Sequence, residues 1–191
     1  MAGPGPAHRT VSLHEWHQIG PDGLPLRHRT VHVLRALRSG LSVYTYRCDS
    51  STARVRAVRG ARAGEPRPDA DGLTAVDLEL HRPLAAGETA SLEYETSFDW
   101  RTVPPPQVRR GMRQRVERVD MRVEFSPDRL PAELSWAVWD GFGPDAGLRA
   151  AEVVELDGDC AAHRFVDAAE GVTVGFTWRW PPGWEPALPA V

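Results

Sequence analysis

The amino-acid sequence predicts an all-β protein: a two-layer antiparallel β-sandwich of roughly 8–11 strands with an immunoglobulin-like or related topology. The first observation is strict alternation of apolar and polar residues, because successive side chains of a strand point to opposite faces. The second is the spacing of turn residues between short candidate strands. The third is that no long segment carries the i, i+3, i+4 apolar repeat of an amphipathic helix.

Three segments show the alternation most clearly, and each is expected to bury one face. Their apolar rows are Val119, Met121, Val123 and Phe125; Val172, Val174, Phe176, Trp178 and Trp180; and Leu92, Tyr94, Thr96 and Phe98. Charged or small residues separate the members of each row. We therefore expect the inner layer of the sandwich to include Leu92, Tyr94, Phe98, Val119, Met121, Val123, Phe125, Val174, Phe176 and Trp178.

Weaker strand patterns fill most of the remaining chain. They cover residues 11–19, 25–37, 42–48, 53–60, 73–81, 133–139, 150–156 and 161–166. The short segment Val33–Arg38 could also be helical, but the β-branched residues Thr30, Val31 and Val33 favour a strand. Thr102–Gly111 contains three consecutive prolines and is predicted to cross between the sheets as an extended surface loop.

A chain of 191 residues fits one domain. We expect a sandwich over residues 10–181, a flexible tail over 1–9 and a Pro-rich tail over 182–191. Met1–Thr10 has no apolar run typical of a signal peptide, and no stretch approaches the roughly 18 apolar residues of a membrane span. These features predict a cytoplasmic protein in which Cys48 and Cys160 are free thiols, although the sequence leaves their pairing open.

The charge is unevenly distributed along the chain. Residues 1–118 carry a formal charge of +5 and residues 119–191 carry −8. The simpler interpretation is that strands from the two halves attract each other within one fold. The alternative is head-to-tail association into a homo-oligomer at low ionic strength.

Histidines are concentrated near the start of the chain. A two-residue turn at Asp22–Gly23 would place His17 opposite His28, with Glu15 on the same face. Two imidazoles and a carboxylate are a ligand set that zinc accepts. The sequence therefore offers His17, His28 and Glu15 as a candidate metal site, against the more common alternative of a solvated polar strand face.

Arginines follow the triple proline. Arg109, Arg110, Arg113 and Arg115 are candidates for docking an acidic partner or a phosphate, because guanidinium groups match both. The alternative is a charged edge strand that prevents aggregation. Nucleic acid is an unlikely ligand, since no aromatic residues interleave with these arginines. If the protein docks such a partner here, Arg109→Glu combined with Arg110→Glu should leave folding intact and weaken partner binding, mainly through the association rate.

The pair Trp136 and Trp139 completes the candidate partner-binding residues. Their odd spacing directs them to opposite faces of a regular strand, so one would lie outside the core unless a bulge re-aims it. An exposed aromatic side chain could bind a flat ligand or a partner. Core packing is the alternative for most of the tryptophans.

The order of several short motifs resembles a known module. His14-Glu15-Trp16 precedes Pro21-Asp22-Gly23, and Pro127-Asp128-Arg129-Leu130-Pro131 precedes Gly175-Phe176-Thr177-Trp178-Arg179-Trp180. Over roughly residues 12–181 the chain resembles the β-rich C-terminal module of actinobacterial helix-turn-helix regulators. About ten residues precede the first expected strand, too few for three helices, so the resemblance implies the sensing half without the DNA-binding domain. It supplies no catalytic residues.

The sequence contains no Gly-x-Ser-x-Gly motif, no P-loop and no dinucleotide-binding glycine motif. We therefore expect a non-enzymatic, sensor-type binding module that needs no cofactor and acts with a separate partner protein or a small ligand. The alternative is a small cytoplasmic enzyme with a pocket in a β-sandwich or barrel, metal-dependent at His17 and His28. Structural self-assembly is a third class.

Overall fold

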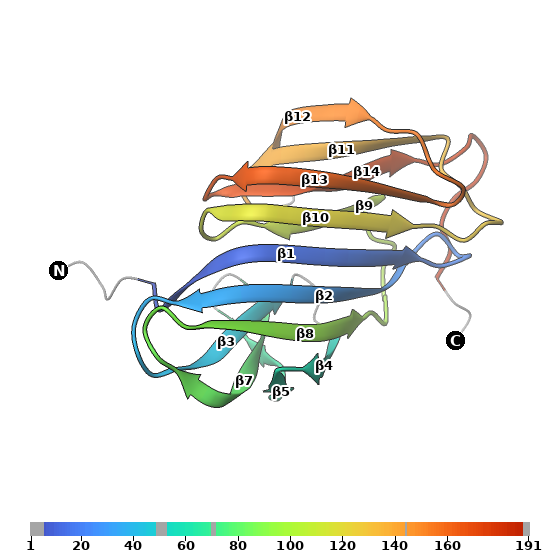
Figure 1. The fold of residues 1–191 in the computed structure, drawn as a ribbon. Coiled ribbons are helices and arrows are strands. Elements are labelled where there is room, and N and C mark those ends of the chain that lie inside the picture. Colours follow the sequence, from blue (N-terminus) through green and yellow to red (C-terminus); the bar gives the residue numbers. More distant parts are fainter. Residues whose placement is uncertain (1–5, 49–52, 70–71, 144, 189–191) are drawn as a thin grey trace.

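The computed structural model describes residues 6–48, 53–69, 72–143 and 145–188, and none of these residues is helical. Figure 1 shows its strands, which are coloured in the order of the sequence. They are β1 (His8–Ile19), β2 (Pro25–Ala36), β3 (Leu41–Cys48), β4 (Arg54–Arg59), β5 (Ala61–Ala63), β6 (Arg67–Pro68), β7 (Thr74–Leu84), β8 (Thr89–Ser97), β9 (Gln107–Gly111), β10 (Val116–Glu124), β11 (Glu133–Asp140), β12 (Gly147–Val153), β13 (Cys160–Ala168) and β14 (Val172–Arg179).

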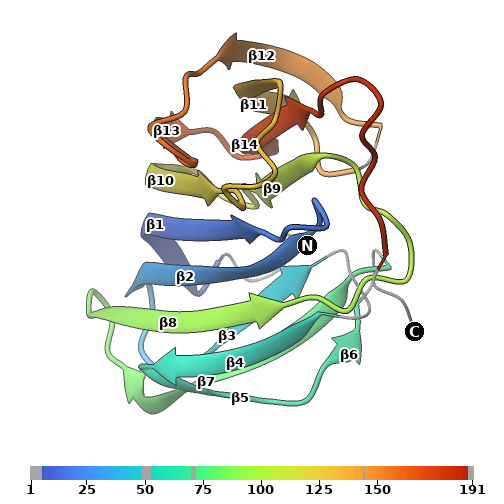
Figure 2. The same ribbon diagram turned by 90° about the vertical axis from the view of Figure 1, so that its right-hand side faces the viewer.

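The strands form a two-layer sandwich in which the second layer is divided. One layer is a six-stranded sheet with the order β13-β10-β1-β2-β8-β4. The other contains the β11 sheet (β12-β11-β14-β9) and the β7 sheet (β3-β7-β5, with β6 paired to β7). Figure 2 shows the two smaller sheets against opposite halves of the large one. The all-β sandwich prediction is confirmed, but the fourteen strands exceed the expected number because short edge strands escaped the alternation pattern.

The two halves of the large sheet meet at β1. This strand pairs antiparallel with β2 and parallel with β10, from Ser12 opposite Arg118 to Gln18 opposite Glu124. Parallel neighbours need a long connection, which the chain from β2 to β9 supplies. The first eight strands therefore build one half of the molecule, and β9–β14 build the other.

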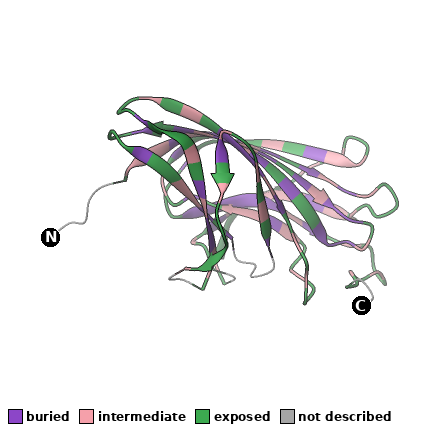
Figure 3. Cartoon of the chain, turned by 90° about the horizontal axis from the view of Figure 1, so that it is seen from below, coloured by how far each residue is buried: buried purple, intermediate pink, exposed green. Residues whose placement is uncertain are grey.

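Each half has its own hydrophobic core. One core lies between the β11 sheet and the β10 side of the large sheet, and it includes Val119 and Phe176. The second lies under the β7 sheet and includes Leu92 and Tyr94. Buried and exposed residues alternate along the strands (Figure 3). Nine of the ten residues predicted for the inner layer are buried, and Phe98 is half-buried.

All eight weaker strand predictions correspond to strands, including Val33–Ala36 as the end of β2. The predicted loop Thr102–Gly111 differs, because its last five residues form β9 at the edge of the β11 sheet. Gly175 permits this pairing, since a Cβ there would lie 1.9 Å from the Val108 carbonyl oxygen. Residues 102–106 do cross between the sheets, from β8 in the six-stranded sheet to β9 in the β11 sheet.

The β1–β2 turn keeps the predicted register with a different loop. His17 pairs with His28 and Glu15 with Thr30, as expected. The loop is longer than the predicted two residues, because Gly20 N donates to Leu24 O and a bulge separates Gln18 from Ile19. The bulge absorbs the extra loop residues while the rest of the ladder stays in register.

Some residues of the predicted tails make contacts with the sandwich. β1 begins at His8, and Ala187 N donates to Asp22 O at 3.3 Å. The indole of Trp184 packs edge-on against Trp180 at 4.4 Å. Residues 1–5 and 189–191 of the predicted tails lie outside the described residues. Cys48 and Cys160 do not form a disulfide, and no helix in the described part of the chain could span a membrane.

Candidate functional site

A buried polar cluster, formed by Glu15, His17, His28, Tyr46 and Arg110, lies between the two cores. Glu15 Oε1 is 3.0 Å from Arg110 Nη1, and the side chain of Glu15 is only 1% exposed. His17 Nε2 lies 3.3 Å from Glu15 Oε2, and His28 Nε2 lies 3.2 Å from the Tyr46 hydroxyl oxygen. The cluster therefore satisfies charged and polar groups that the fold removes from water.

Arg110 connects all three sheets. It projects from β9 of the β11 sheet to Glu15 of the six-stranded sheet. Its Nη2 donates to the hydroxyl of Tyr44 on β3 at 3.1 Å and to that of Tyr94 on β8 at 3.4 Å. Its guanidinium also lies 5.4 Å from the centre of the Tyr46 ring. One side chain thus spans the boundary between the β7 and β11 sheets.

Burial and neighbouring charges set the ionisation of this cluster. Burial lowers the pKa of His28 to about 3, and the nearby His17 and Arg110 act in the same direction. Burial also holds the pKa of His32 well below its usual value. For Glu15 burial alone would raise the pKa, but Arg110 and His17 outweigh it and lower the pKa. At neutral pH the cluster therefore contains the Glu15–Arg110 ion pair beside the neutral imidazole of His28.

The predicted metal ligands meet as the register required, with the rings of His17 and His28 centred 4.9 Å apart. The described residues nevertheless contain no group of three or more His, Cys, Asp and Glu placed to hold a metal ion. The carboxylate of Glu15 is occupied by Arg110 and His17. Sequence reasoning missed Arg110 as the partner of Glu15, because only the tertiary structure brings β9 over β1.

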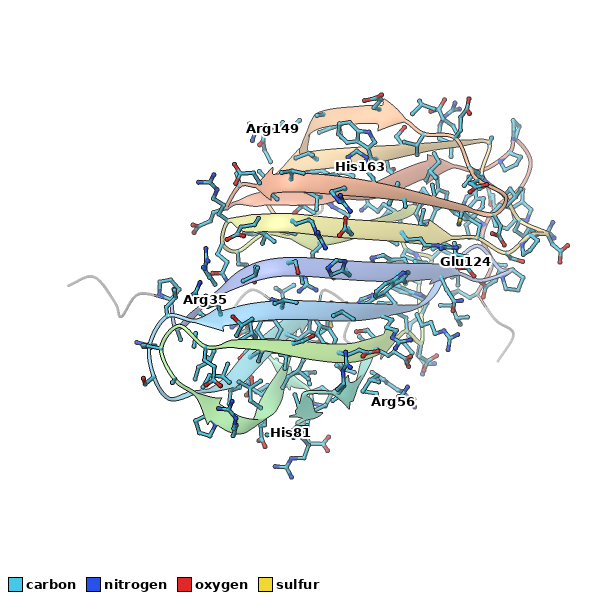
Figure 4. All side chains as sticks on the ribbon, viewed as in Figure 1. Arg35, Arg56, His81, Glu124, Arg149 and His163 are labelled. Atoms are coloured by element: carbon cyan, nitrogen blue, oxygen red, sulfur yellow. The ribbon has the colours of Figure 1, made fainter. Side chains whose placement is uncertain are left out.

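The second candidate site is the open face of the six-stranded sheet, the side turned away from the two smaller sheets. At its centre Trp16 on β1 lies directly between Arg122 on β10 and Arg29 on β2. Trp16 is 42% exposed, and it borders a hollow of about 540 Å³. Figure 4 shows this face, with Glu124 toward one end of β10 and Arg56 on β4.

The carboxylates of this hollow already have arginine partners. Glu93 is paired with Arg29 and Arg59, and Glu95 with Arg56 at 2.6 Å. Arg27 differs, because its Nε donates at 2.5 Å to the neutral amide oxygen of Gln18, and no described carboxylate pairs with it.

Glu124 and Arg122 are held only loosely. The amide of Gln18 lies 3.4 Å from Glu124, and Arg122 lies 3.6 Å from the same carboxylate. Beside Trp16, the guanidinium groups of Arg27 and Arg122 can therefore still bind an anion.

The predicted arginine surface requires one correction. Residues of β9 alternate in direction, so Arg110 faces inward with its side chain only 14% exposed, while Arg109 faces outward. Replacing Arg110 by glutamate would place a second carboxylate beside Glu15, so the expectation of intact folding does not hold. Arg113 lies 5.3 Å over the Phe142 ring, and Arg115 pairs with Asp167.

Trp136 and Trp139 point to opposite faces, as their spacing predicted, but neither is an open aromatic platform. Trp136 packs partly buried against the core and stacks on His163 at 4.7 Å. Trp139 points outward but is only 7% exposed, because the guanidinium of Arg109 lies 4.5 Å above it. A role for these residues in partner binding remains a prediction.

No protein-family model matches this sequence, and neither does any curated protein. Among solved structures the chain is similar to a protein from Parabacteroides distasonis described as a "putative protease", with 13% identity and a TM-score of 0.56 over 90% of this chain. It is also similar to an M1 zinc metallopeptidase from Deinococcus radiodurans, with 14% identity and a TM-score of 0.47. The chain spans 40% and 42% of those proteins. The similarity to the former shows the fold alone.

The buried histidines predict that the folded protein becomes less stable as the pH falls. The unfolded chain binds a proton at each histidine near pH 6.5, whereas His28 in the folded chain resists protonation down to about pH 3. The free energy of unfolding should therefore decrease as pH falls through this window, by up to about 1.4 kcal/mol per pH unit for His28. Urea unfolding at a series of pH values from neutral to acid measures this slope. His28→Gln should flatten it, and a flat wild-type profile would contradict the assignment.

The buried ion pair predicts that removing one of its charges costs more stability than removing both. Arg110→Met should cost about 3–5 kcal/mol, because it leaves Glu15 buried without its counter-charge. Adding Glu15→Met should recover much of that loss, since both charges are then gone. Chemical denaturation of the two variants tests this, with Arg115→Met as the control that breaks an exposed pair. Equal losses in the Arg110 variant and the control would refute the role of the buried pair.

Proposed function

We propose that this chain is a non-enzymatic binding module whose binding surface is the open face of the six-stranded sheet. The observation that carries the proposal is Trp16, which exposes 42% of its surface in the middle of a sheet, beside a hollow of about 540 Å³. Tryptophan and arginine together are the residues that most often dominate binding energy at interfaces. The arrangement Arg122–Trp16–Arg29 supplies that combination on one face.

The open face is also preorganised. Asp120 lies within 3.0 Å of side-chain nitrogens of His14, Arg118 and Arg164, which come from three adjacent strands. The opposite face of the same sheet packs on both cores and cannot shift independently. Side chains that are ordered before binding lose less conformational entropy when a ligand arrives.

The chemistry of the hollow favours binding over catalysis. The described residues that line it include no serine, threonine, cysteine or lysine, so the nucleophiles on offer are its carboxylates and His17. Its carboxylates Glu93 and Glu95 are engaged by arginine rather than set beside a substrate space. His17 borders the hollow, but its ring turns inward to Glu15.

The fold and the sequence resemblance are compatible with this role. In the Parabacteroides distasonis protein the same fold occupies 40% of a longer chain, so it occurs there as one part of a larger protein. The resemblance to the regulator module supports a sensor-type role in the cytoplasm with a separate partner protein or a small ligand. The binding role itself depends on the open face.

Trp16→Ala should abolish ligand capture without unfolding the protein. Immobilised wild-type protein, the Trp16→Ala variant and a Val166→Ala control would be exposed to an extract of the natural host, and retained proteins and small molecules identified by mass spectrometry. Val166 is a matched control, because it is exposed on the edge strand of the same sheet. At least one molecule should be retained by wild type and control but lost with Trp16→Ala. Identical retention by all three would refute the open face as the binding surface.

Metal content separates this proposal from the enzyme alternative. Protein purified without an affinity tag should contain no stoichiometric zinc or iron, because the Glu15 carboxylate is committed to Arg110. Elemental analysis by mass spectrometry measures this directly. A stoichiometric metal that disappears in His28→Ala would instead favour a metal-dependent enzyme.

A further inference from the structure

We infer that the hollow beside Trp16 binds a small planar ring that carries an anionic group. The ring would stack on the Trp16 indole, and the carboxylate or phosphate of the ligand would be bound by Arg27 and Arg122. This inference rests on the proposed function and names the class of ligand.

The register places the required groups together. Trp16 is directly opposite Arg122 in the β1–β10 ladder, and Gln18, the next residue on the same face, is opposite Arg27 in the β1–β2 ladder. Arg27 is therefore a diagonal neighbour of Trp16, within reach of a group attached to a ring on the indole. The two arginines belong to β2 and β10, the strands on either side of β1.

The charge balance selects an anion. Arg29 and Arg59 share Glu93, and Arg56 is paired with Glu95, so each of these arginines already has a carboxylate partner and the three together exceed their two carboxylates by one positive charge. Arg27 donates only to a neutral amide oxygen, and Arg122 has a carboxylate at the long distance of 3.6 Å. Both retain guanidinium donors for a bidentate bond to carboxylate or phosphate.

The size and aromatic content of the site select a small ligand with one aromatic ring system, single or fused. A volume of about 540 Å³ lies within the usual range of small-molecule pockets. Trp16 is the one large aromatic side chain among the described residues that line the hollow. Proteins that bind single-stranded nucleic acid need several stacking positions in succession, so a single platform fits one ring better than an extended strand.

The test follows the indole N–H signal of Trp16 by heteronuclear NMR, assigned by its loss in Trp16→Phe. The probes are indole-3-acetate for the carboxylate source and adenosine 5′-monophosphate for the phosphate source. Indole, adenosine and inorganic phosphate are the corresponding fragments. At least one anionic probe should shift the Trp16 signal and bind at least about 10-fold more tightly than its fragments, because a charge-assisted bond adds to stacking.

The variants identify which groups recognise the anion. Arg27→Gln and Arg122→Gln should each weaken binding of the anionic probe about 10-fold and leave the affinity for the neutral ring unchanged. Arg62→Gln is the matched control, because this exposed arginine lies on β5 and pairs with Glu79. Both test arginines are exposed, and circular dichroism of each variant confirms that folding is retained.

Two results would overturn the inference. One is that neither anionic probe shifts the Trp16 signal at millimolar concentration; the other is equal binding by wild type and both arginine variants. If an extract component still depends on Trp16 for capture, the ligand class is wrong and the binding module stands. If that capture is also independent of Trp16, the proposed function fails as well.

Discussion

The buried ion pair between Glu15 and Arg110 is the constraint on which the rest of this structure depends. The two smaller sheets pack against opposite halves of the large sheet, and the cluster that contains the pair fills the seam between the two cores. Removing two charges from water is costly, and their attraction compensates only when the remaining donors and acceptors are satisfied. His17 completes Glu15, while Tyr44 and Tyr94 complete Arg110. The pair therefore defines where the β11 sheet sits relative to the β7 sheet.

Strand β1 links this buried pair to the open face. Glu15 and His17 point inward, so the residue between them, Trp16, must point outward. If β1 slipped by one residue against β2 and β10, the Trp16 indole would be buried and the Glu15 carboxylate would be exposed. The polar cluster thus specifies a register that apolar side chains alone would leave ambiguous, and the same register presents the tryptophan to solvent. The buried cluster and the proposed binding surface thus have a common origin in three consecutive residues, Glu15, Trp16 and His17.

Local information in the sequence was sufficient for most strands and for the β1–β2 register. The row Val119–Phe125 was correctly assigned to the core because alternation reports directly on burial, and His17 met His28 because a turn relates neighbouring strands. The sequence pattern placed Arg110 on the surface. Its partner Glu15 could not be foreseen, because the two residues meet only through the pairing of β9 with β14 and the packing of one sheet on another. Trp16 was overlooked for a related reason: both faces of β1 carry polar residues, so hydropathy could not identify the exposed one. The signal that the sequence did offer for an exposed Trp16 was its position between two ionisable residues, Glu15 and His17.

A ligand on the open face would act on the same strand that holds the buried pair. Any molecule that binds only the folded chain stabilises it in proportion to its concentration relative to its dissociation constant. Acid works in the opposite direction, because the unfolded chain takes up protons that His28 and Glu15 exclude when buried. If the proposed ligand occupies the hollow, its binding would offset acid destabilisation, with no movement of the sheets required. The polar cluster and the hollow lie on opposite faces of one strand, so both require β1 to keep its register.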